Sequence, residues 1–566
     1  MKLVATCLLT LLLSGVLLAQ AGPATQDPPA DPAKPAVVTP QQLQALQDAL
    51  AAQQKQIDQQ QQELEALRRQ LAGGSAPQVS DAALHTSSSE ATARAVVGDA
   101  VAPDEEKAKE SPLSFRIGGA EFTPGGWVDF ENVFRTTNTG NASSTSFGSI
   151  PFSNTIQGHL TEFRATGQYS RLTLKTHASF GQNDITGYLE ADFNGNDPAN
   201  TFVTGNSHTA RLRLYWLDLK RGKWEFLGGQ TWGLLEPNRV GVSPMPSDLT
   251  LGYSEDGNTH VGPYYTRTAE FRVAYHFNDH VVWAASIDNP QQYVGTGEVI
   301  FPFAFNAQLG PQFDAGNNPG TPNVAPDVAT KVAYDNVVAG RNFHAEAGGL
   351  LTTVKVTDFP VGGTEFTSHS SVGGGLEAGL NFDLFRDAQG RDLRFVGSVL
   401  WGNGIGRYLT GLAPQAVIVP VPTGPATFTV DISKVHSGGV FTGLEFLPWA
   451  NTQLGVYYGA VYAQRNAFQD VTSPVITTIP CNAGDVAPFH PCIGFGGPNS
   501  PNSANRAIQE ATLDWTQTFW RNREYGALQL VTQWSYLTRA PWFVAAGAPK
   551  NAHLFMSYVS LRYVLP

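Results

Sequence analysis

The sequence predicts an all-β fold, a 16-stranded antiparallel transmembrane β-barrel preceded by a short N-terminal coiled-coil helix. Three observations predict this fold. Only 15% of the 566 residues are charged, although 42% are hydrophobic. From about residue 125 onward, polar and apolar residues alternate with the two-residue period of a β-strand. Short and long connections also alternate along the chain, which is typical of outer-membrane barrels.

The N-terminal residues 1–21 have the pattern of a secretory signal peptide. Lys2 supplies the positive start, an apolar core follows, and Ala19-Gln20-Ala21 forms a small-residue cleavage site. A membrane anchor is the alternative, but the apolar run is short for a spanning helix. Residues 22–39 are rich in Pro and Ala and predict an extended tether.

Residues 40–73 predict a short coiled coil. Apolar residues recur every seven positions, and the second position of the seam is partly glutamine. A single amphipathic helix that packs on another surface is the alternative. Residues 74–113 predict a flexible linker, and residues 114–566 the barrel itself. The residues of the seam are Leu43, Leu50, Ile57, Leu64 and Leu71.

Sixteen segments in the remainder of the chain have the composition and alternation of strands. Period-two patterning is clearest in Arg171–Ala178, where polar and apolar residues take opposite faces. The predicted strands are 125–136, 168–180, 184–194, 209–219, 224–231, 265–277, 280–288, 328–338, 342–354, 370–384, 392–404, 436–447, 451–463, 506–520, 525–538 and 551–565.

The connections between these strands differ in length. Brief turns, such as 181–183 and 278–279, alternate with long segments. Short periplasmic turns and long external loops are the known asymmetry of outer-membrane barrels. An even number of strands leaves both termini on the periplasmic side. The long segments are 137–167, 232–264, 289–327 and 464–505.

One face of each strand is polar, and we expect it to line a water-filled lumen because lipid contacts the apolar face. Arg and Lys at a constriction favour anions. The alternative is that these charges only pair with one another. The residues assigned to pore lining and anion selectivity are Arg171, Lys175, Arg211, Arg213, Arg239 and Arg272, with Glu190, Asp192 and Glu270 as counter-charges and Arg562 on the last strand.

Loop 232–264 follows a tryptophan and is long enough either to fold into the lumen or to cap the surface. The sequence leaves these two positions open. Tryptophans along the strands fit the aromatic girdles of a membrane barrel, although core packing would explain some of them. The tryptophans assigned in this way are Trp127, Trp216, Trp283, Trp515 and Trp534.

Two cysteines remain after the signal peptide, Cys481 and Cys492, and in an oxidising compartment they predict one disulfide. His490 lies between them and makes a metal site a weaker alternative. No nucleophile elbow, HExxH motif or phosphate-binding loop occurs, so we expect neither an enzyme nor a cofactor or metal. The net charge of −12 gives no indication of a nucleic-acid partner.

Several segments resemble the DcaP-type porins, which are related to the phosphate-selective porins. The likeness covers roughly residues 40–72 and 115–240 and implies a trimeric sixteen-stranded channel for small anions such as dicarboxylates. It implies pore roles for Arg171, Arg211 and Arg213 only. The segments are Gly126-Trp127-Val128-Asp129-Phe130, Ser170-Arg171-Leu172, Tyr188-Leu189-Glu190-Ala191-Asp192-Phe193, Arg211-Leu212-Arg213-Leu214 and Gly228-Gly229-Gln230-Thr231-Trp232.

The sequence therefore predicts an outer-membrane porin that passes small anionic solutes by passive diffusion. We expect it to contact the lipid bilayer and lipopolysaccharide, to form a homo-oligomer, most simply a trimer, and to hold its coiled coil in the periplasm. The alternative function is a barrel anchor whose coiled coil serves as a spacer that contacts peptidoglycan or a partner protein.

Overall fold

The computed structural model describes residues 112–141, 143–195, 208–245, 255–295, 297–315, 321–322 and 325–566. All of them belong to one compact unit, Thr86–Pro566. The predicted signal peptide, tether and coiled coil, and nearly all of the linker 74–113, lie outside the described residues, and those assignments stay predictions. None of the helices in the described ranges is long and apolar enough to cross a membrane.

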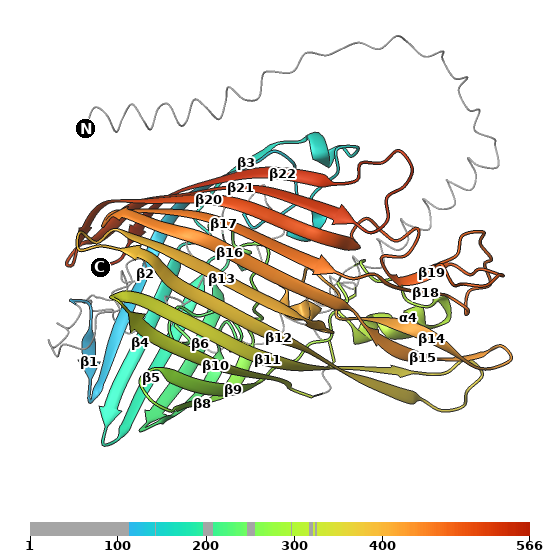
Figure 1. Ribbon diagram of the computed structural model, residues 1–566, viewed down its shortest axis with the longest axis horizontal. Coiled ribbons are helices and arrows are strands. Elements are labelled where there is room, and N and C mark those ends of the chain that lie inside the picture. Colours follow the sequence, from blue (N-terminus) through green and yellow to red (C-terminus); the bar gives the residue numbers. More distant parts are fainter. Residues whose placement is uncertain are drawn as a thin grey trace, which may run out of the picture. The chain divides into compact units, whose positions relative to one another are not determined.

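Sixteen antiparallel strands form one closed barrel (Figure 1). Closure is provided by the last strand, which pairs with its predecessor on one side and with the first barrel strand on the other. The barrel strands are β2 (Ala120–Arg135), the interrupted strand β3 (Glu162–Thr166) and β4 (Arg171–Phe180), β5 (Asn183–Asp192), β6 (Arg211–Arg221), β7 (Trp224–Gln230), β8 (Ala269–His276), β9 (Val281–Asp288), β10 (Asp327–Val338), β11 (Arg341–Asp358), β12 (Thr367–Arg386), β13 (Asp392–Asn403), β16 (His436–Trp449), β17 (Thr452–Ala463), β20 (Asn505–Asn522), β21 (Gly526–Pro541) and β22 (Ala552–Val564).

The other elements are not strands of the barrel ring. A short strand makes a hairpin with the start of β2, and two further hairpins and a few short helices lie in the long connections. The strands are β1 (Phe115–Ile117), β14 (Ala416–Gly424), β15 (Thr427–Lys434), β18 (Asn466–Gln469) and β19 (Cys492–Phe495); the helices are η1 (Phe147–Ser149), η2 (Gln157–His159), η4 (Phe303–Phe305), α4 (Asn306–Leu309), η5 (Gly310–Gln312) and η6 (Gly406–Tyr408).

Alternation of side chains explains why these segments close into a barrel rather than stack as a sandwich. In β22, Phe555 and Leu561 are exposed on the outer surface, whereas Tyr558 and Ser560 on the other face are buried. Other barrel strands repeat this pattern, with apolar side chains outside and polar ones inside. The sheet thus presents hydrocarbon outward along its whole circumference, and closure leaves no unpaired strand edge.

The connections separate by length at the two ends of the barrel. The turn after β4 has two residues, since Phe180 pairs with Asn183, and the turn after β10 is equally short, since Val338 pairs with Arg341. In an antiparallel ring every second connection lies at the same end, so these turns share one end and the long loops the other. Sixteen strands and their antiparallel order are as the sequence predicted.

Local details of several predicted strands were wrong. Strand 168–180 begins earlier, as β3, and is interrupted because the chain turns at Gly167–Ser170, where the Ser170 amide donates to the Gly167 carbonyl. In β6 the register shifts between Ala191 and Glu190 of β5, which pair with Leu212 and Leu214. This bulge turns Leu214 and Trp216 toward the interior, so Trp216 is buried and cannot belong to an external girdle.

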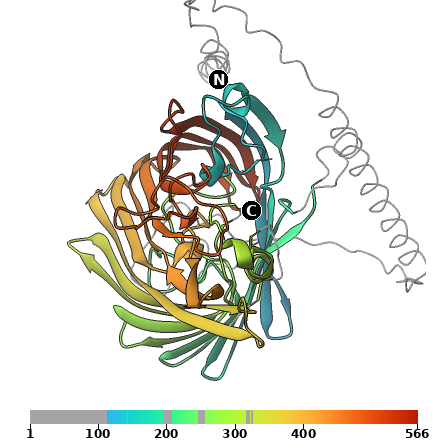
Figure 2. The same cartoon turned by 90° about the vertical axis from the view of Figure 1, so that its right-hand side faces the viewer.

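The interior of the barrel holds chain as well as side chains. Figure 2, which views the end with the long loops, shows segments inside the ring of strands. One buried apolar cluster joins wall residues such as Val461 and Tyr558 to Val261 and Tyr264, which belong to the connection between β7 and β8. This connection therefore packs against the inner side of the wall.

Candidate functional site: the lumen and the loop that crosses it

The connection 231–268 between β7 and β8, called here the crossing loop, folds into the barrel. Its described parts are 231–245 and 255–268. The first part reaches strands far from its own: the Arg239 guanidinium pairs with Glu445 of β16 at 2.7 Å, and Lys331 of β10 donates to the Glu236 carbonyl at 2.9 Å. The question that the sequence left open is thereby answered, because this loop lies in the lumen.

The second part of the crossing loop binds the C-terminal strands. The amide of Glu255 donates to Gln533 Oε1 of β21 at 2.7 Å, and the amide of Val261 donates to Glu510 Oε2 of β20 at 2.8 Å. Arg562 of β22 pairs with the Glu255 carboxylate at 3.0 Å. Side-chain acceptors on the wall thus satisfy the loop's backbone amides, as buried amides require.

Glycines allow the crossing loop to touch the wall by its backbone. A Cβ on Gly262 would lie 2.1 Å from the Val440 carbonyl oxygen. Across from it, a Cβ on Gly459 of β17 would lie 1.7 Å from the Val261 oxygen. Only glycine fits at these contacts.

The backbone angle of Gly262, with φ at 105°, lies in the region that side chains rarely adopt. Its carbonyl oxygen also comes within 2.6 Å of where a Cβ on Gly439 of β16 would stand. Three glycines from the loop and from two wall strands therefore make one contact of backbone on backbone. This contact fixes the height at which the loop crosses the lumen.

On the wall beside the loop, β4, β5 and β6 bring arginines and carboxylates together. Arg213 pairs with Glu190 through Nε and with Asp192 through Nη1, each at 2.8 Å. Arg211 also pairs with Asp192, at 2.7 Å, and Arg171 lies 3.4 Å from Glu190. Strand pairing produces this group, since Glu190 and Asp192 lie on the same face of the strand between the arginines.

Two tryptophan rings carry guanidinium groups from this wall. Arg171 and Arg562 lie over the Trp127 ring, at 4.4 and 4.9 Å from its centroid, so Trp127 is on the interior face and its assignment to an external girdle was wrong. Arg213 lies 5.3 Å from the centroid of Trp232, the tryptophan at the start of the crossing loop. Cation–π contacts of this kind hold an arginine in place without neutralising its charge.

A second guanidinium over Trp232 belongs to Arg267, at 5.6 Å. Arg267 was not among the predicted pore residues, because it fell within the predicted strand 265–277, on the face opposite Glu270 and Arg272. In the structure β8 begins only at Ala269. We define the arginine cluster as Arg171, Arg211, Arg213 and Arg267, which face two carboxylates, Glu190 and Asp192, and leave an excess of two positive charges.

The remaining predicted pore residues have different surroundings. Arg272 of β8 is buried, pairs with Glu270 at 2.6 Å and donates to the Val242 carbonyl at 2.8 Å, so it anchors the crossing loop. Lys175 of β4 is exposed and makes no ion pair or hydrogen bond with the described residues. The predicted pore arginines are thus all paired with carboxylates, whereas the Lys175 ammonium has no such partner among the described residues.

Carboxylates of the crossing loop are themselves perturbed. Burial raises the pKa of Glu236 well above its usual range, against the opposing effect of Lys331. Both Glu236 carboxylate oxygens lack a hydrogen-bond partner among the described residues. Burial likewise raises the pKa of Glu255, with a further contribution from Asp129.

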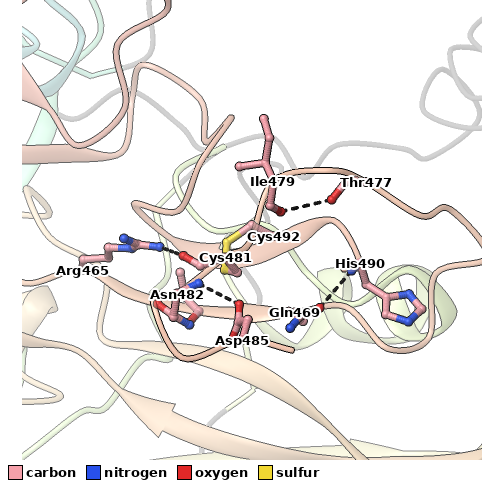
Figure 3. Close-up of a disulfide and its surroundings, with 10 residues drawn as sticks. Arg465, Gln469, Thr477, Ile479, Cys481, Asn482, Asp485, His490 and Cys492 are labelled. Atoms are coloured by element: carbon pink, nitrogen blue, oxygen red, sulfur yellow. Dashed lines mark hydrogen bonds between the residues drawn. A yellow bond between two sulfur atoms is a disulfide. The ribbon is translucent and has the colours of Figure 1, made fainter. Parts of the chain in front are cut away.

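A disulfide closes part of the connection between β17 and β20, joining Cys481 to Cys492 (Figure 3). Arg465 donates to the Cys481 carbonyl, and the His490 amide donates to Gln469 Oε1 at 2.9 Å. The His490 imidazole points away from the sulfurs in Figure 3. Within the described ranges no group of three or more His, Cys, Asp or Glu is arranged to hold a metal ion.

The sequence matches no protein-family model, and it matches no curated protein. Among solved structures, the outer membrane channel DcaP of Acinetobacter baumannii aligns over 80% of this chain and 99% of its own, with a TM-score of 0.52 at 16% identity. This chain has the DcaP channel fold. The resemblance found in the sequence is thereby confirmed at the level of the fold.

Other solved structures align with lower scores. The anion-selective porin from Comamonas acidovorans has a TM-score of 0.41 at 10% identity and covers 79% of this chain and 100% of its own. OprB of Pseudomonas putida has a TM-score of 0.40 at 11% identity and covers 78% of this chain and 94% of its own.

Proposed function

We propose that this protein is a bacterial outer-membrane porin, a passive diffusion channel for small anionic solutes. The observation that carries the proposal is the arginine cluster on the lumen wall, where four guanidinium groups face two carboxylates. The channel fold shared with DcaP and the apolar outer surface support insertion into the outer membrane. The lipid bilayer and lipopolysaccharide are then its surroundings.

The positive excess favours anions because charges in a narrow lumen are weakly screened by water. Lys175 and Arg171 contribute most to this preference: Lys175 is exposed and has no partner among the described residues, and Arg171 lies 3.4 Å from Glu190, a looser pairing than those of the other two arginines on this wall. Arg211 and Arg213 are closely paired and contribute less per charge. Assembly as a homotrimer is part of the proposal and rests on the resemblance to the DcaP-type porins and on the predicted coiled coil.

Planar-bilayer recording tests this function. The purified full-length protein is inserted between unequal KCl solutions, and the sign of the reversal potential gives the preferred ion. We expect preference for chloride, and a double variant Arg171→Gln/Lys175→Gln should lower the chloride-to-potassium permeability ratio by at least about twofold.

The matched control is Lys223→Gln, which removes one positive charge from the exposed turn between β6 and β7. It should leave the reversal potential unchanged. A protein that inserts but does not conduct would overturn the porin proposal and favour the barrel-anchor alternative. Preference for potassium would overturn the anionic part alone.

A further inference from the structure

Arg267 has a backbone conformation that a bulky side chain rarely takes. It lies two residues before β8, and its φ is 40°, in the left-handed region. Such a conformation is strained and persists where the surroundings enforce it, often at functional sites. Arg267 lies where the crossing loop meets the first strand after it, so the path of the loop sets the direction of its side chain.

The surroundings of Arg267 hold its guanidinium by stacking and leave its hydrogen-bond donors open. The group lies over Trp232, whose ring is also contacted by Arg213 and, edge-on, by Tyr265 with centroids 4.9 Å apart. With the described residues Arg267 forms no ion pair and donates no hydrogen bond. A guanidinium has five N–H donors in a planar fork, which matches the two oxygens of a carboxylate.

The charges that act most strongly on Arg267 are of its own sign, and Asp192 opposes them more weakly. Burial, and after it the charges of Arg213 and Arg211, lower the pKa of Arg267 to about 10. The group is therefore still positive at neutral pH, although its neighbours repel it. An anion between these groups would relieve the repulsion and occupy the open donors.

We propose that Arg267 is the anion-binding residue beside the crossing loop and holds the carboxylate or small oxyanion group of a passing solute. This inference rests on the proposed function of an anion channel. It makes Arg267, rather than the closely paired Arg211 and Arg213, the residue that determines which anions bind on the way through. Its position over Trp232 keeps the open edge of the guanidinium available while the stacked face stays in contact with the ring.

The test measures single-channel conductance of the full-length protein against potassium acetate concentration. If anions bind at a site, the conductance levels off as the acetate concentration rises. A diffuse positive field, by contrast, only raises the local anion concentration. Arg267→Asn removes the charge and retains a residue that tolerates the left-handed conformation. We expect the half-saturating acetate concentration to rise about tenfold, as for loss of a charged hydrogen bond. Arg267→Lys should give an intermediate value, because it keeps the charge without the planar fork.

Lys223→Gln serves again as a control with the same loss of charge, and its saturation curve should match that of the unchanged protein. If the unchanged protein conducts anions and Arg267→Asn saturates at the same concentration, the role of Arg267 is wrong and the channel function stands. If the unchanged protein does not conduct anions, both proposals are wrong. Heat-modifiable gel migration shows whether each variant contains a folded barrel.

Discussion

At the scale of the residue, the effect of a charged side chain depends on what it already binds. Arg213 and Arg267 share the Trp232 ring, yet Arg213 holds two carboxylates and Arg267 holds none among the described residues. Sequence patterning predicted Arg213 from its place on a strand face. It did not predict Arg267, because the left-handed angle that removes this residue from the ladder depends on the loop around it.

The surroundings of a side chain also determine the pKa of a carboxyl group outside the barrel wall. Glu298 lies in the connection between β9 and β10, and burial, together with the charge of Asp314, raises its pKa to about 8. Its ordinary value is 4.5. A carboxyl whose pKa is raised by folding gives its loop full stability below the ordinary value, and that stability falls as the pH rises toward 8.

We therefore expect the connection between β9 and β10 to lose stability as the pH rises from about 5 to about 8.5. Hydrogen exchange of residues 293–300, corrected for the intrinsic pH effect, should be faster at the higher pH. Glu298→Gln keeps the shape of the side chain and should remove the difference. Equal protection of the unchanged protein at both pH values would show that Glu298 does not titrate in this way.

At the scale of the element, most strands follow from local pattern, but their neighbours in the lumen do not. All sixteen barrel strands were predicted because alternation is a property of each segment. The hairpins β14–β15 and β18–β19 were not, since they lie within long connections and have no lipid-facing pattern. The bulge in β6 also escaped prediction, because a register shift depends on the partner strand.

The contact between the crossing loop and β17 gives an element-scale prediction. Gly459→Ala would place a methyl group against the Val261 carbonyl, so the loop must move away from the wall. We expect a loss of stability of about 1–3 kcal/mol, typical of overpacking, and a change in conductance. Thermal unfolding followed by gel migration and single-channel recording measure the two effects.

Gly228→Ala in β7 is the matched control, because a Cβ there meets only the Phe271 side chain, at 4.0 Å. It should unfold at the same temperature as the unchanged protein. If Gly459→Ala behaves like this control in both measurements, the loop does not lie against β17.

At the scale of the whole molecule, the barrel is complete within residues 112–566, since β22 pairs with β2. Strand number, order and the asymmetry of connection lengths could be predicted from the sequence because lipid demands a closed ring with an apolar exterior. The path of the crossing loop could not, because its partners are single acceptors such as Gln533 and Glu510, spread over distant strands.

Deleting residues 22–111 should therefore leave a barrel that folds and migrates heat-modifiably on gels. This deletion also removes the predicted coiled coil, so native migration reports whether that segment sets the oligomer. A trimer that survives the deletion would place the determinants of assembly on the barrel. Failure of the shortened chain to form a barrel would show that the N-terminal region is needed for folding.

The crossing loop also constrains the order in which the molecule can be assembled. Glu255 is held by Arg562, which belongs to the last strand, and this strand must pair with the first to close the ring. The loop comes from the middle of the chain, and its contact with Arg562 can form only when β22 is in place. Its final contacts then form together with closure. The strand that closes the cylinder is thus also one that holds the chain inside it, which couples maturation of the pore to maturation of the wall.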